Sequence, residues 1–275
     1  THPKESEISL TMYKRLRLNM IFLILLISLT PFLLLGGIVS YEYSFMVRNG
    51  LEEQVKYRAR VQANAVDLYL KGRAAILSGM ADLHSIDSLV EGDGLARLLQ
   101  VINHRSGGFV DLGVIDDKGQ HLAYVGPYNL QGLNYYQQGW FAEAMGRGLY
   151  ISDVYMGFRQ VPHYVIAVRR QENQRAWILR ATIDSDAFNL FVREAKVGKT
   201  GDAFIVNREG LFQTRPRFGG EILAESGLDP SLFGEGAVIE RGTDDGGRIL
   251  LAGSWLKNKD WLLVITQDAA EGMGA

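Results

Sequence analysis

The sequence has no cysteine in 275 residues, and charge of neither sign dominates it. Without cysteine the chain forms no disulfide, no thiolate nucleophile and no cysteine-based zinc site, although this absence does not distinguish cytoplasm from periplasm. The 29 basic and 31 acidic residues give a formal net charge of −2, so no polyanion-binding character shows overall. We therefore expect no nucleic acid as a partner.

Motifs for catalysis and metal binding are lacking as well. The five histidines include no pair at i, i+4, which argues against a zinc site. No serine lies in a Gly-x-Ser-x-Gly elbow. The piece Gly198-Lys199-Thr200 looks like the end of a phosphate-binding loop, but Arg193 stands where that loop needs its first glycine. The sequence thus predicts no enzyme activity, no metal and no cofactor.

One long hydrophobic run is present near the N-terminus. Residues 20–41 carry no charged side chain, and this length crosses roughly 30 Å of hydrocarbon. Lys14, Arg15 and Arg17 precede the run, which places residues 1–19 in the cytoplasm by the positive-inside bias. A cleaved signal peptide is the alternative, but its apolar core is shorter and no small-x-small pattern follows Ile38. We predict a transmembrane helix in the inner (plasma) membrane, with the following residues periplasmic or extracellular.

Residues 42–80 contain no proline, and their apolar positions recur at spacings typical of one face of a long helix. These positions are Leu51, Val55, Ala59, Ala65, Leu68, Tyr69, Ile76 and Met80. A solvated linker would not need such a stripe. We expect it to be buried, either against the following domain or against a second copy of the chain, and we expect a homodimer through this stalk helix.

Strand patterns follow the stalk. Residues 110–125 read as a hairpin that turns at 116–119, and residues 164–168 and 176–183 read as two further strands. Between them lies a loop and short helix rich in aromatic residues. An antiparallel sheet with aromatic insertions is a way to build a small-molecule pocket. A similar hairpin at 203–214, with closing strands near 248–255 and 261–267, indicates a second, related unit.

At this point the chain resembles the extracytoplasmic double Cache sensor domains of bacterial receptors. The pieces that carry the resemblance are Trp140-Phe141, the stretch 150–155 and the stretch 197–210. The resemblance implies an α/β (α+β) fold of two tandem PAS-like modules with central antiparallel sheets behind a long helix. Residues 81–185 would form the membrane-distal module and residues 186–268 the membrane-proximal one. Residues 269–275 would begin a linker to a second transmembrane helix that the sequence does not include.

The resemblance also implies a ligand site in the distal module. In the amino-acid-binding branch of the family, an arginine two residues before the tryptophan binds the ligand carboxylate. An aspartate near the end of the strand at 176–183 binds the amino group, and a tyrosine assists. Trp140, Phe141 and Tyr155 match the aromatic positions. Gln138 stands in place of the arginine and Thr182 in place of the aspartate, so we do not expect an amino acid as the ligand.

Strand alternation brings Arg180 to the same face as Thr182. A guanidinium group prefers a planar anion, so we predict a ligand that carries a carboxylate or is otherwise rich in hydrogen-bonding groups. The alternatives are that Arg180 pairs with Asp153, Asp184 or Asp186, and that the aromatic residues only fill the core. The predicted ligand-binding residues are Tyr135, Gln138, Trp140, Phe141, Asp153, Tyr155, His163, Arg180 and Thr182.

The predicted function is therefore the extracytoplasmic small-molecule-sensing region of a membrane receptor. Through the resemblance, the favoured output is a sensor histidine kinase of a two-component system. A chemotaxis transducer and a cyclic-dinucleotide enzyme are alternatives for the output. A different class of function is a membrane-anchored module that docks a periplasmic protein.

Overall fold

The computed structural model describes residues 4–194, 200–234, 237–242 and 247–270. Residues 1–3 of the predicted cytoplasmic segment lie outside the described residues. The same holds for residues 197–199, at the predicted opening of the second module, and for residues 271–275 of the predicted linker. The chain divides into two compact units, Thr1–Leu51 and Glu52–Ala275.

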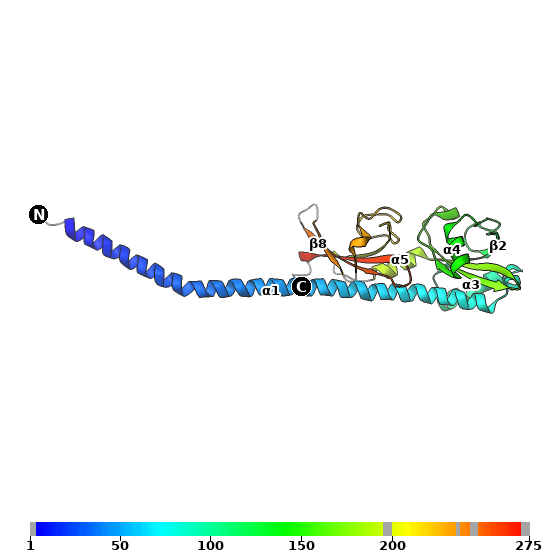
Figure 1. The fold of residues 1–275 in the computed structure, drawn as a ribbon, viewed down its shortest axis with the longest axis horizontal. Coiled ribbons are helices and arrows are strands. Elements are labelled where there is room, and N and C mark those ends of the chain that lie inside the picture. The colour runs from blue at the N-terminus through cyan, green and yellow to red at the C-terminus, as the bar shows by residue number, and fades with distance from the viewer. Residues whose placement is uncertain (1–3, 195–199, 235–236, 243–246, 271–275) are drawn as a thin grey trace. The chain divides into compact units, whose positions relative to one another are not determined.

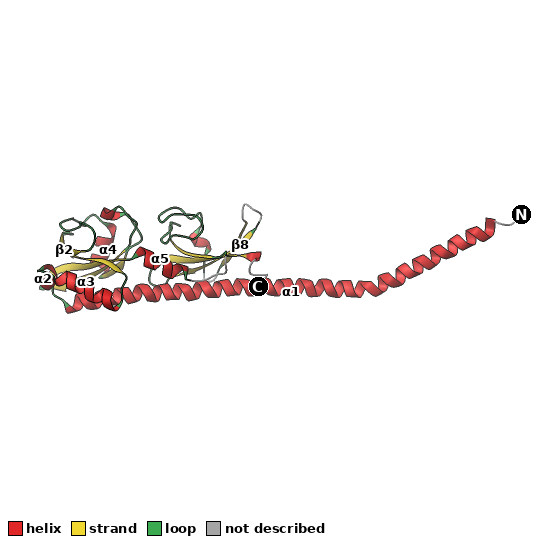
Figure 2. Ribbon diagram, turned by 180° about the vertical axis from the view of Figure 1, so that it is seen from behind, coloured by secondary structure: helices red, strands yellow, loops and turns green. Residues whose placement is uncertain are grey.

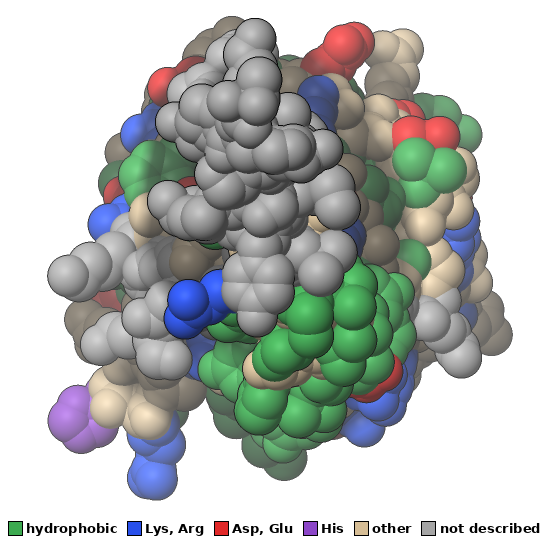
Figure 3. Space-filling view, turned by 90° about the vertical axis from the view of Figure 1, so that its left-hand side faces the viewer, with side chains coloured by type: hydrophobic (Ala, Val, Ile, Leu, Met, Phe, Trp, Pro, Cys, Tyr) green, Lys and Arg blue, Asp and Glu red, His purple; other side chains and the backbone are tan. Residues whose placement is uncertain are grey.

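A single helix, α1 (Lys4–Leu83), begins the chain (Figure 1). It contains an apolar stretch long enough to cross a membrane by length and composition, and none of that stretch is buried inside the protein. Figure 3 views the molecule from the N-terminal side and shows apolar side chains gathered in one continuous green surface. Pro31 lies inside the helix, as membrane helices tolerate.

From Leu51 onward, one face of α1 is buried by the chain itself. The buried residues recur every three or four positions and are Leu51, Val55, Ala59, Ala63, Val66, Leu70, Ala74, Leu77 and Ala81. Of the stripe predicted from the sequence, Leu51, Val55 and Ala59 are buried, and Ala65, Tyr69, Ile76 and Met80 are half-buried. The chain itself thus covers part of the predicted stripe. The assignment of Leu68 to this stripe is wrong, because its side chain is 71% exposed.

The first sheet has the strand order β2-β1-β5-β4-β3, and all its neighbouring strands are antiparallel. Three helices, α2, α3 and α4, and the 3-10 helix η1 belong to this part of the chain (Figure 2). The elements in chain order are α2 (Ile86–Val90), α3 (Gly94–Arg105), β1 (Phe109–Asp116), β2 (His121–Val125), α4 (Gly139–Arg147), β3 (Leu149–Ile151), η1 (Gly157–Arg159), β4 (Val165–Glu172) and β5 (Arg175–Ile183).

The second sheet has the order β6-β9-β8-β7 and is also antiparallel. Its elements are α5 (Ser185–Arg193), β6 (Asp202–Asn207), η2 (Pro230–Leu232), β7 (Val238–Gly242), β8 (Arg248–Trp255) and β9 (Trp261–Asp268). The second arm of the predicted 203–214 hairpin pairs with β6 only through an isolated bridge between Val206 and Phe212. The expectation of a mixed α+β fold, with a long N-terminal helix and two antiparallel sheets, is confirmed.

Candidate ligand-binding site

One face of the first sheet carries both an apolar and a polar half. Alternation along β1 turns Asp111, Gly113 and Ile115 to this face. The register aligns Gly113 with Arg180 and Asp111 with Thr182 on β5, so these side chains share the face. Polar groups therefore gather around Asp111, while apolar ones gather around Ile115.

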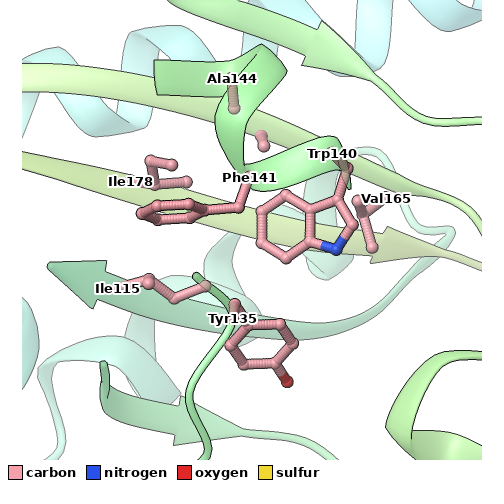
Figure 4. Close-up of a cluster of buried hydrophobic side chains, with 8 residues drawn as sticks. Ile115, Tyr135, Trp140, Phe141, Ala144, Val165 and Ile178 are labelled. Carbon is pink, nitrogen blue, oxygen red and sulfur yellow. The ribbon is translucent and has the colours of Figure 1, made fainter. Parts of the chain in front are cut away.

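The apolar half is covered by α4. Trp140 and Phe141, in its first turn, are 5% and 3% exposed and pack with Ile115, Val165 and Ile178. Figure 4 shows the Phe141 ring beside Ile178 and the Trp140 indole between Val165 and the Tyr135 ring. The Tyr135 and Trp140 ring centroids are 5.4 Å apart.

The polar half is built on Asp111, whose side chain is fully buried. Arg180 Nη2 donates to its Oδ1 at 3.0 Å, and the Tyr124 hydroxyl donates to its Oδ2 at 3.0 Å. Arg159, brought in by η1, forms an ion pair with the same Oδ2 and donates to Thr182 Oγ1 at 2.5 Å. Two guanidinium groups thus share one carboxylate, which leaves this buried cluster with a net positive charge.

Several buried polar atoms beside this cluster have no hydrogen-bond partner among the residues that the structure describes. They are His121 Nε2, Tyr135 OH, Trp140 Nε1, Arg159 Nε and Arg180 Nε. Their side chains are neighbours: Tyr135 lies with its ring centroid 5.2 Å from that of His121 and 5.7 Å from the Arg180 guanidinium. Each buried group left without a partner costs about 1–3 kcal/mol. A polar ligand that hydrogen-bonds to these atoms would offset that cost.

Tyr155 and His163 form a second aromatic pair, with ring centroids 4.5 Å apart. His163 Nδ1 lies 2.8 Å from the Val161 carbonyl oxygen, and burial lowers the pKa of His163 to about 4. Burial raises the pKa of Tyr155 to about 12, so its hydroxyl is protonated at neutral pH. Gln138 is the half-exposed residue that precedes α4, and its side chain makes no capping bond to the helix.

Asp153 lies away from this cluster. Its Oδ1 accepts from Trp261 Nε1 at 2.8 Å and contacts Lys259 Nζ at 2.5 Å, and its Oδ2 accepts from Asn207 Nδ2 at 3.3 Å. Asp153 therefore contacts the second sheet, and we do not include it in the candidate site. Nor does Arg180 pair with Asp153, Asp184 or Asp186 as considered above, because Asp111 holds it.

Sequence reasoning missed four residues of the polar half: Asp111, Tyr124, His121 and Arg159. Asp111 had a weak signal, because it is an acidic residue within an otherwise apolar strand. Arg159 had none, since only the tertiary structure brings the loop after β3 over β1. Ligand binding by Tyr135, Gln138, Trp140, Phe141, Tyr155, His163, Arg180 and Thr182 stays a prediction.

Comparison with solved structures finds this fold in receptor domains. The ligand-binding domain of the Pseudomonas fluorescens chemoreceptor CtaA, in complex with L-isoleucine, is 14% identical, with a TM-score of 0.65 over 82% of this chain and 96% of that chain. The ligand-binding domain of the Pseudomonas aeruginosa PAO1 amino acid chemoreceptor PctB, in complex with L-Arg, is 16% identical, with a TM-score of 0.61 over 80% and 88%. The chain has the fold of a receptor sensor domain.

The same fold occurs in the extracellular domain of rpHK1S-Z16, a protein assigned to the histidine kinases. That domain is 14% identical, with a TM-score of 0.55 over 86% of this chain and 99% of that chain. No protein-family model and no curated protein matches the sequence. The predicted resemblance to the sensor domains of bacterial receptors is confirmed at the level of the fold.

Proposed function

We propose that this chain is the extracytoplasmic sensory region of a membrane receptor, with a double Cache arrangement, and that the candidate site binds a small carboxylate. The observation that carries this proposal is the buried charge of the site. Arg159 and Arg180 share the single carboxylate of Asp111, and polar atoms without partners surround them. A buried positive charge and the fork geometry of a guanidinium group both favour a carboxylate.

The site differs from an amino-acid site at two positions. Gln138 stands where the resemblance places an arginine for the ligand carboxylate, and Thr182 stands where it places an aspartate for the amino group. Thr182 Oγ1 accepts a hydrogen bond from Arg159. Arg180 and Arg159 would take over carboxylate binding, so the amino acids in the CtaA and PctB structures are not the expected ligand class here.

Calorimetric titration of the full chain in nanodiscs with a panel of small carboxylates tests the proposal. Arg180→Lys keeps the charge that balances Asp111 but loses the planar fork, so the affinity of the carboxylate that binds should fall by roughly tenfold or more. Arg175→Lys is the matched control, since Arg175 lies on the same strand with an exposed side chain. Equal affinities for both variants, or binding of none of the panel, would contradict the proposal.

The apolar part of α1 would span the membrane, with the N-terminus in the cytoplasm and the sheets outside. A homodimer would form through the face of α1 that the domain leaves open. On this face Tyr57, Val61 and Leu68 are 67%, 47% and 71% exposed. Their spacing of four and seven residues matches a coiled-coil seam, and two chains anchored in one membrane would meet in parallel.

The contacts of α1 with the rest of the chain suggest how ligand binding changes the position of the membrane helix. Asp67 accepts from the backbone amides of Lys257 and Asn258 at 2.7 and 3.2 Å, and Arg73 donates to the Ser106 carbonyl oxygen at 2.9 Å. A cavity of about 630 Å³ lies between α1, α4, β3 and the β8–β9 turn. A ligand that shifts α4 on the sheet would move α1 against its partner in the dimer.

A sensor histidine kinase is the favoured output, with a chemotaxis transducer and a cyclic-dinucleotide enzyme as alternatives. The sequence encoded downstream of Ala275 discriminates among them, because a kinase, a transducer and a cyclase differ in their cytoplasmic domains. A module that docks a periplasmic protein would instead bind no small carboxylate and would keep its function in the Arg180→Lys variant.

A further inference from the structure

His121 enters the candidate site because β1 has a glycine beneath it. A β-carbon on Gly113 would lie 2.2 Å from His121 Nε2, so a larger residue there would displace the imidazole. Gly113 is aligned with Tyr124 on one side and with Arg180 on the other. The Nε2 atom therefore lies over β1, next to the strand that carries Arg180.

The hydrogen bond at the other ring nitrogen sets the role of Nε2. His121 Nδ1 lies 2.7 Å from the Leu130 carbonyl oxygen, and a carbonyl oxygen only accepts, so Nδ1 carries the proton. Burial, and then the nearby Arg180, lower the pKa of His121 to about 4, so the ring is neutral at pH 7. Nε2 is then an acceptor, and it is buried without a partner among the described residues.

The carboxylate of Asp111 has little capacity left for a ligand cation. Its Oδ1 accepts from Arg180, and its Oδ2 accepts from both Arg159 and Tyr124. An ammonium group in this cluster would meet two guanidinium groups and a carboxylate that is already occupied. The cluster therefore disfavours a ligand cation and favours an anion, and His121 Nε2 is an acceptor available to a neutral donor.

We propose that the ligand is a hydroxycarboxylate without an ammonium group. Its carboxylate accepts hydrogen bonds from the free donors of Arg159, Arg180, Tyr135 and Trp140, and its hydroxyl donates to His121 Nε2. This inference rests on the proposed function, because it assigns the ligand class of the same site. His121 and Gly113 become the residues that select the hydroxyl group.

Two matched sets of probes test this by calorimetric titration of the full chain in nanodiscs. The first set is L-lactate, propionate and L-alanine, and the second is L-2-hydroxy-4-methylpentanoate, 4-methylpentanoate and L-leucine. In at least one set, the hydroxy acid should bind about tenfold more tightly than the unsubstituted acid, because an acceptor left unpaired disfavours that ligand. The amino acid should bind most weakly.

In Gly113→Ala and in His121→Phe, the hydroxy acid and its unsubstituted analogue should bind with nearly equal affinity. Gly146→Ala is the matched control, since a β-carbon there meets no atom within 4 Å. Circular dichroism confirms that each variant is folded. If one of the two variants fails to fold, the other still tests the inference. An affinity difference that survives in every folded variant overturns the inference, as does an amino acid that binds most tightly or a complete lack of binding by the six probes.

The same data separate this inference from the proposed function. If neither hydroxy acid binds more tightly than its unsubstituted analogue, and Arg180→Lys still weakens binding of the carboxylates that bind, the hydroxyl selection is wrong and carboxylate sensing stands. If Arg180→Lys weakens no carboxylate, carboxylate sensing itself is wrong.

Discussion

At the scale of single residues, Asp111 sets the charge balance of the buried cluster. Its carboxylate balances one of two buried guanidinium groups and accepts from the Tyr124 hydroxyl. A buried ion pair is a weak source of net stability, but the loss of one partner leaves an uncompensated charge. The cluster therefore makes the folded domain sensitive to the loss of any one of these charges.

Asp111→Asn should destabilise the folded domain by about 3–5 kcal/mol, because Arg159 and Arg180 lose their counter-charge. Chemical denaturation followed by circular dichroism measures this difference. Asp117→Asn is the control, as Asp117 is exposed in the turn after β1. An added carboxylate that binds the site should restore part of the lost stability in Asp111→Asn, since it supplies a counter-charge. A variant as stable as the control would contradict this role of Asp111.

Two buried histidines make stability depend on pH. Burial lowers the pKa of both His121 and His163 to about 4, against about 6.5 in the unfolded chain. The unfolded state then binds more protons, so stability is present above pH 6.5 and is lost as the pH falls from 6.5 towards 4. Each histidine should lower the unfolding free energy by roughly 2 kcal/mol between pH 7 and pH 5.

Denaturation at pH 7 and pH 5 measures this loss, and His163→Gln should remove about half of it. Exposed His104, on α3, offers the control substitution His104→Gln, which should leave the pH dependence unchanged. A His163→Gln variant with the full pH dependence would contradict the assignment.

At the scale of elements, α1 has one face buried by the domain and another face that is exposed. The stripe that includes Val55, Ala59 and Ala63 is covered by the chain's own domain, whereas Tyr57, Val61 and Leu68 are exposed. The apolar pattern that predicted a dimer thus belongs mainly to the domain. The exposed face carries fewer apolar groups, which suits a dimer contact that shifts when a ligand binds.

Single cysteines on α1 test the dimer in a chain that has no other cysteine. Val61→Cys and Leu68→Cys should form disulfide-linked dimers on oxidation in nanodiscs or native membranes, because a parallel seam brings equivalent positions together. Ala63→Cys is the control, since residue 63 is 2% exposed and faces the domain. Cross-linking at position 63 as efficient as at 61 and 68 would contradict the seam.

At the scale of the whole molecule, the segment from Ser152 to Tyr155 links the two sheets. Tyr155 packs at the candidate site, while Asp153 bonds to Trp261, and the Val154 amide donates to Gln213 Oε1 at 2.8 Å. A change at the site therefore has a short path to the second sheet, along two peptide bonds and then through hydrogen bonds.

Asp153→Ala should weaken this link, because the Trp261 indole and the Lys259 ammonium lose their acceptor. We expect a loss of about 1–3 kcal/mol and a broader unfolding transition, as the two sheets unfold less cooperatively. Scanning calorimetry records both effects. Asp260→Ala removes an exposed ion pair with Arg208 on the neighbouring turn and should have little effect. Identical transitions in the two variants would contradict the linking role.

The sequence by itself determined the parts of this protein that depend on local pattern. The uncharged run at 20–41 and the three-to-four spacing after it predict a long helix, and strand alternation places Arg180 and Thr182 on one face. These features follow from the periodicity of helices and strands, so they need no knowledge of distant contacts.

Only the tertiary structure decided what meets Arg180. Asp111 and Arg159 are 48 residues apart in sequence and come together because antiparallel pairing sets β1 beside β5 and the loop after β3 returns over them. It also decided that Asp153 belongs to the link between the sheets and that Leu68 is exposed. Buried charges pair with whichever groups the fold brings close to them, and the local sequence pattern does not specify which groups those are.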